Sequence, residues 1–260
     1  MIAPGAEEGR KHTSLQREKV KDLFSVQQII LYSIACMASM VSFNGNIAPF
    51  GLAIFAAVCG SKMAAGVVYV ACLVGTLIGF GNTEFLNYLL TTLIFIVAIL
   101  TIRPRYQNEN RNEKQKVGVY IFVSTFVVQM IRILFGTFLL YDLLSAIALS
   151  CMVYIFYKIF VNSLPVIKEY GDKKAFSVEE VIGASLLLSI AFAALAGLTV
   201  YNFSITNILS IMIVLFLGWK NGMLAGATAG ITIGMVLGLI TESSPVLISS
   251  VAISRNVSSE

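Results

Sequence analysis

Long runs of apolar residues alternate with short polar segments along almost the whole chain. The runs approach the roughly 20 residues that an α-helix needs to cross a hydrocarbon core of about 30 Å. Backbone groups inside lipid must find hydrogen-bond partners within their own segment, so we interpret the runs as helices. The pattern predicts an all-α, polytopic transmembrane helical bundle of about nine to ten short spans.

The polar segments divide the chain into regions. The short segment Gly81–Glu84 predicts a tight hairpin between the third and fourth spans. Ser177 followed by Glu180 is a capping-box pattern, which predicts the start of a helix. We expect a basic tail at 1–24, membrane helices one to four within 25–102, a loop at 103–116, helices five and six within 117–161, a second loop at 162–177, helices seven to nine and an incomplete tenth within 178–254, and a polar end at 255–260.

The distribution of Lys and Arg predicts the orientation. If the tail lies in the cytoplasm and the spans alternate, every basic residue except Arg132 falls on that side, in the tail, in a loop or, like Lys158, near the end of a span. The turns on the other side contain no Lys or Arg. Cytoplasmic loops of membrane proteins carry an excess of these residues, so we expect a cytoplasmic N-terminus and cytoplasmic loops at 103–116 and 162–177.

Composition excludes several classes of protein. Hydrophobic residues make up 57% of the chain and charged residues only 12%, which a soluble domain of this length would not show. The net charge of +4 comes from basic residues scattered among loops, so we expect the lipid bilayer as partner and no nucleic acid. The four cysteines lie within apolar runs and His12 is alone in the tail, so we expect no disulfide, metal site or cofactor.

One charged residue lies inside a span. Arg132 belongs to the expected fifth span, and its expected partner is Asp142 near the outer start of the sixth. Charges within a membrane are costly and mark functional sites by default. The alternatives are a structural ion pair, an Arg132 side chain that reaches the outer headgroups, or a role in transport or proton relay. No second buried acid is present to complete a relay.

Glycines recur at every fourth position near the end of the chain. They are Gly218, Gly222, Gly226, Gly230, Gly234 and Gly238. Such spacing forms one smooth helix face that another helix can approach closely, as in small-xxx-small motifs. We expect this face of the ninth span either to pack within the chain or to mediate self-association.

Catalytic patterns are absent from the sequence. It shows no nucleophile with a histidine base, no phosphate-binding glycine loop, no Cys/His cluster and no paired acidic motif in a polar setting. Glu179 and Glu180 lie where carboxylates favour a helix N-terminus. We therefore expect no catalytic residues and no enzyme activity in this chain.

The order of several short motifs resembles a known family, the membrane-spanning amino-terminal region of stage II sporulation protein E from spore-forming Firmicutes. The resemblance covers roughly residues 25–248. The order and spacing of the motifs along the chain are more specific than any one of the motifs. The motifs are Ala48-Pro49-Phe50-Gly51, Arg132 followed by Tyr141-Asp142, Asn162-Ser163-Leu164-Pro165, the SVEEV segment from Ser177 to Val181, Gly197-Leu198 and the glycine-rich ninth span.

The resemblance implies a function. Family members continue into a cytoplasmic self-association region and a manganese-dependent serine phosphatase, and they link the division septum to forespore transcription. This chain departs from the pattern near Val251, so we expect a truncated or frame-shifted product or a fragment. It would then be a membrane anchor and assembly module at the septal cell membrane, with septal or division proteins as partners. The alternative is a small permease or a membrane component of a transporter, although transporters show more buried polar residues.

Overall fold

The computed structural model describes residues 25–41, 48–59, 65–102, 111–135, 139–168, 177–196, 198–201 and 203–240, and nearly all of them are helical. The elements are α2 (Val26–Ser39), α3 (Pro49–Cys59), α4 (Ala65–Ile102), α5 (Arg111–Phe135), α6 (Leu140–Lys168), α7 (Val178–Ala193), β1 (Thr199–Val200), β2 (Phe203–Ser204), α8 (Ile205–Asn221) and α9 (Met223–Ile240). The fold is the all-α bundle that the apolar runs predict.

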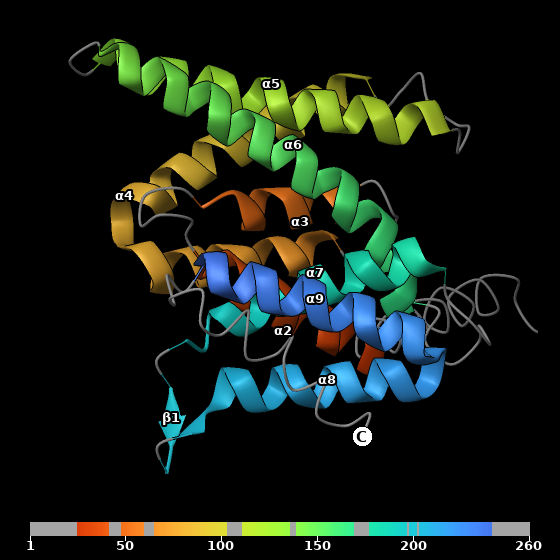
Figure 1. Cartoon of the computed structure of the whole chain (residues 1–260). Helices are drawn as coiled ribbons and strands as arrows, with labels where there is room; N and C mark the ends of the chain where they lie inside the picture. The colour runs from red at the N-terminus through yellow and green to blue at the C-terminus, as the bar shows by residue number, and fades with distance from the viewer. Residues whose placement is uncertain are drawn as a thin grey trace, which may run out of the picture.

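The helices lie roughly side by side (Figure 1). α5 and α6 pack together at one edge, α3 and α4 lie next to them, and α2 and α7 connect these helices to α9. α8 lies at the opposite edge, where its main neighbour is α9. Peripheral helices in such an arrangement keep one face open to the surroundings, and α8 carries many exposed apolar side chains.

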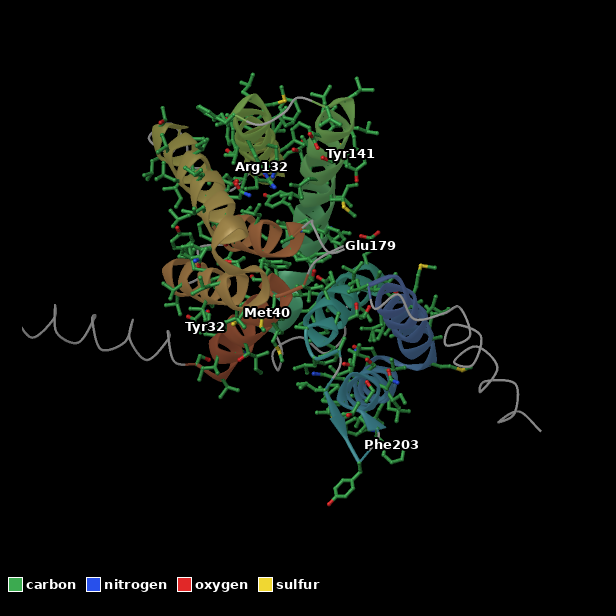
Figure 2. All side chains as sticks on the ribbon, turned by 90° about the vertical axis from the view of Figure 1, so that its left-hand side faces the viewer. Tyr32, Met40, Arg132, Tyr141, Glu179 and Phe203 are labelled. Carbon is green, nitrogen blue, oxygen red and sulfur yellow. The ribbon has the colours of Figure 1, made fainter. Side chains whose placement is uncertain are left out.

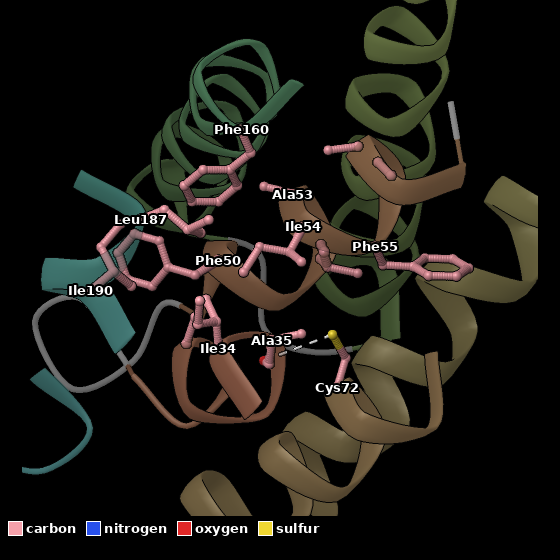
Figure 3. Close-up of a cluster of buried hydrophobic side chains, with 14 of the residues drawn as sticks. Ile34, Ala35, Phe50, Ala53, Ile54, Phe55, Cys72, Phe160, Leu187 and Ile190 are labelled. Atoms are coloured by element: carbon pink, nitrogen blue, oxygen red, sulfur yellow. Dashed lines mark hydrogen bonds between the residues drawn. The ribbon is translucent and has the colours of Figure 1, made fainter. Parts of the chain in front are cut away.

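The short helix α3 forms the centre of the core. Every residue from Pro49 to Val58 is buried. Its 11 residues span only about 16 Å, roughly half of a hydrocarbon core. Figure 3 shows Phe50 and Ile54 facing Phe160, Leu187 and Ile190 from α6 and α7. This part of the chain is therefore shielded by protein rather than by lipid.

Gly81 divides α4 into two arms. Its φ of 72° and ψ of −162° break the helix, and glycine adopts positive φ without steric cost. Thr92 Oγ1 donates a hydrogen bond to Tyr69 Oη at 3.4 Å, 23 positions away in the sequence. An unbroken helix would hold these residues about 35 Å apart. The two arms therefore form the tight hairpin that Gly81–Glu84 predicts.

Three of the described helices are long and apolar enough to cross a membrane, judged by length and composition. They contain Ala65–Asn82, Gln115–Phe135 and Leu140–Leu164. The other apolar helices, including both partners of the α8–α9 pair, have 10–17 residues in their apolar segments. The bundle thus combines full-length spans with short helices.

Two helices extend into segments expected to be loops. α5 begins at Arg111 rather than near residue 117, and α6 continues past residue 162 to Lys168. In α6 the continuation places Ser163, Leu164 and Val166 in buried positions. That packing outweighs the loss of a backbone N–H donor at Pro165. The described parts of the expected loops at 103–116 and 162–177 are therefore partly helical.

The link between α7 and α8 contains a short β-hairpin, which the expected run of helices within 178–254 did not include. α7 ends at Ala193, and β1 pairs antiparallel with β2, Val200 opposite Phe203. The β-branched residues Thr199 and Val200 and the aromatic Phe203 favour the extended backbone of these two strands.

Some expectations concern residues outside the described ranges. These are the tail at 1–24, the loop segments 103–110 and 169–176, the incomplete tenth helix and the polar end at 255–260.

Candidate functional site

The glycine face brings α8 and α9 into close contact. A Cβ atom added at Gly226 would lie 2.8 Å from the Gly218 Cα atom, and one added at Gly230 would lie 3.4 Å from Val214 Cγ1. Gly226 is buried, as are Ala225 and Ala229 beside it. The structure therefore uses this part of the glycine pattern for packing within the chain, at backbone-to-backbone distance.

The remaining glycines of the pattern have other positions. Gly222 is outside both helices: it follows α8 with a φ of 89°, is exposed and joins α8 to α9. It is a turn residue, so the prediction that Gly222 belongs to the packing face is wrong. A Cβ atom added at Gly234 would meet nothing within 4 Å. Gly234 and Gly238 are half-buried in the second half of α9. The close contact between α8 and α9 therefore involves Gly218, Gly226 and Gly230, and not Gly222 or Gly234.

A second pair of glycines with the same spacing packs α4 against α2, and the sequence reasoning missed it. A Cβ atom at Gly75 would collide with the carbonyl oxygen of Cys36, and one at Gly79 would lie 2.8 Å from the carbonyl oxygen of Met40. Gly51 similarly leaves room for Ser39 of α2: a Cβ atom added at Gly51 would lie 2.7 Å from the Ser39 Oγ atom. The four-residue spacing of Gly75 and Gly79 is the signal that could have identified this contact.

Arg132 and Asp142 lie at the same end of the α5–α6 pair. Arg132 is in the last turn of α5 and Asp142 in the first turn of α6. Arg132 is exposed and Asp142 half-buried. Figure 2 shows Arg132 on α5 and Tyr141, the neighbour of Asp142, on α6. Both residues lie at the same end of this helix pair, as the expected ion pair requires. The ion pair itself stays a prediction.

The start of α7 has the capping geometry that the sequence predicts. The Glu180 backbone N–H donates to Ser177 Oγ at 3.2 Å, and the Ser177 N–H donates to Glu180 Oε2 at 2.9 Å. These two reciprocal bonds confirm the capping box. Glu179 is exposed in the same turn, where a carboxylate favours the helix dipole. Capping thus accounts for the acidic pair.

Buried hydroxyl groups in the described helices mostly bond within their own helix. Ser39 Oγ donates to the Ala35 carbonyl at 2.7 Å, Thr125 Oγ1 to Ile121 at 2.7 Å, and Ser150 Oγ to Ala146 at 2.8 Å. This is the usual way to satisfy a hydroxyl in an apolar helix. Among the described residues, no group of three His, Cys, Asp or Glu side chains could hold a metal ion. The described bundle is built for packing.

Comparison with known proteins identifies the family. A family model described as SpoIIE, N-terminal domain, matches residues 4–255, nearly the whole chain. The chain belongs to the SpoIIE N-terminal domain family. No curated protein and no solved structure matches it. The SpoIIE match covers the helices α2 to α9, including the glycine contacts and the Arg132 region, so these features belong to the SpoIIE membrane module.

Proposed function

We propose that this chain is a membrane anchor and assembly module that localises to the division septum during sporulation and carries no catalysis of its own. The observation that supports the proposal is the match to the SpoIIE N-terminal domain over residues 4–255, a region that coincides with an apolar helical bundle. The described residues contain packed helices and no candidate metal centre. An anchor needs this combination of lipid-facing surface and rigid core.

The assembly part of the proposal concerns the open half of α9. Ile231 and Met235 are 64% and 54% exposed, and Gly234 between them has space around its Cβ position. We propose that a second copy of the chain packs against this face, which α8 leaves uncovered. Small residues beside flexible apolar side chains allow close helix approach in lipid.

Localisation is tested by fusing the chain to a fluorescent protein and imaging it in a sporulating bacterium. We expect membrane fluorescence that becomes concentrated at the asymmetric septum, the site of action that the sequence resemblance implies. An unrelated polytopic membrane protein with the same fluorescent protein is the control, since a septum contains two membranes and doubles any signal. If the fusion is no more enriched than this control, the septal part of the proposal is wrong.

A further inference from the structure

The hairpin between α7 and α8 carries exposed apolar side chains from its base to its tip. Leu198, Tyr201 and Phe203 are 53%, 93% and 69% exposed. Figure 1 shows the hairpin projecting beyond the end of α8, and Figure 2 shows Phe203 away from the other helices. No charged residue occurs between Glu180 and Lys220. An uncharged projection with two exposed aromatic rings suits an environment that is at least partly apolar.

The hairpin is held in a defined position. The Ile205 N–H donates to the Leu198 carbonyl at 3.1 Å, and Thr206 Oγ1 donates to the Phe192 carbonyl at 3.3 Å. Tyr201 has a φ of 50°, in the left-handed region that bulky residues seldom adopt. The turn therefore fixes the tyrosine backbone in an unusual conformation at the tip instead of leaving a loose connection.

Helix length places the tip near the edge of the hydrocarbon. α8 has 17 residues and is about 26 Å long, somewhat less than a core of about 30 Å. If α8 crosses the membrane, both its ends lie at the interfaces. Phe203 lies two residues before its first residue, and Trp219, 85% exposed, lies in its last turn beside Lys220. Tyr and Trp concentrate at the two membrane–water interfaces.

The exposed face of α8 connects these two aromatic ends. Ile208, Ile211, Met212 and Leu215 are all more than half exposed, and each is apolar. The hairpin tip is thus continuous with an exposed apolar face that runs along the helix. The exposure of these side chains shows that no other element described in the structure covers that face.

We propose that Tyr201 and Phe203 insert into the headgroup region of the bilayer. Trp219 occupies the interface of the opposite leaflet, and together the two ends fix the depth of the α8–α9 pair. The partner is the lipid interface itself, recognised through amphipathic aromatic rings and not through a particular headgroup charge.

The natural sequence favours a fluorescence test, because Trp219 is its only tryptophan. The full chain is reconstituted in phosphatidylcholine vesicles containing lipids that carry a quencher at the headgroup, at a shallow acyl position or at the acyl end. The same is done for the double variant Trp219→Phe/Tyr201→Trp. We expect the headgroup and shallow quenchers to be the most effective for both proteins. A quencher confined to the outer leaflet should reduce the emission of only one of the two tryptophans, the one at position 201 or the one at position 219.

The matched control is Trp219→Phe/Met212→Trp, because Met212 is exposed near the middle of the same helix. Its emission should be quenched most by the acyl-end lipid. Equal melting temperatures in detergent show that all three proteins are folded. Quenching of the residue 201 tryptophan by aqueous iodide but by no lipid would place the tip in water, available to a protein partner, and would overturn the proposal. Quenching of positions 201 and 219 from the same leaflet would also overturn it.

Discussion

At the scale of single residues, the structure separates glycines that look equivalent in the sequence. Gly226 lies against the backbone of Gly218, Gly222 makes the turn, and Gly234 has open space around its Cβ position. The four-residue spacing predicts a smooth helix face but not which neighbour covers it. That depends on where the chain reverses, which the positive φ of Gly222 decides.

This difference allows a test with a minimal change. Gly226→Ala places a methyl group 2.8 Å from the Gly218 Cα atom, so the two helices must move apart. Overpacking of this kind costs about 1 to 3 kcal/mol, and we expect a lower melting temperature in detergent.

Gly234→Ala is the matched control, because it makes the same chemical change in the same helix with nothing within 4 Å. It should melt like the parent or slightly higher, since alanine is the better helix former. The proposed contact between copies predicts that Gly234→Leu shifts the oligomer towards monomer without lowering stability. Equal melting temperatures for Gly226→Ala and Gly234→Ala would contradict the close α8–α9 contact.

At the scale of elements, the end of a helix depends on more than local pattern. Sequence placed the start of α7 correctly, because a capping box is a local signal from Ser177 and Glu180. It ended α6 too early, because the burial of Leu164 and Val166 that continues the helix is a tertiary effect that local pattern does not show. It missed the β1–β2 hairpin, whose strands of two residues each are too short to show a period within an apolar run.

The capping box at the start of α7 can be weakened with one substitution. Ser177→Ala removes the acceptor for the Glu180 N–H, and loss of an N-cap side chain typically costs about 0.5 to 2 kcal/mol. We expect faster hydrogen exchange in the first turn of α7 and a modest fall in melting temperature. Ser177→Asp keeps an acceptor and should behave like the parent. If alanine and aspartate give the same exchange rates, the cap does not stabilise this turn.

At the scale of the whole molecule, the fold class could be predicted because lipid permits few structures. Uninterrupted apolar runs in a chain with 12% charged residues leave helices as the solution. The central place of α3 could not be predicted, because a helix apolar all round can be covered by lipid or by protein with the same sequence. Contacts from α2, α4 and α6 cover α3 with protein, and α6 lies far from α3 in the sequence.

The orientation of the bundle is the prediction that applies to the whole molecule. It rests on the basic residues, all of which except Arg132 share one side if the N-terminus is cytoplasmic. Two exposed positions, Gln115 in α5 and Asn82 beside the α4 reversal, should then lie on opposite sides. A single cysteine is introduced at either position in a chain whose four native cysteines are replaced by alanine.

An impermeant thiol reagent added to intact protoplasts should label Asn82→Cys and leave Gln115→Cys unlabelled until the membrane is opened. Labelling after lysis shows that both thiols are reactive, so a difference before lysis reports sidedness alone. Because α4 and α5 connect these positions, the result also tests whether the second arm of α4 crosses the bilayer. Labelling of Gln115→Cys in intact protoplasts would place the basic loops outside, against the charge bias from which the topology is inferred.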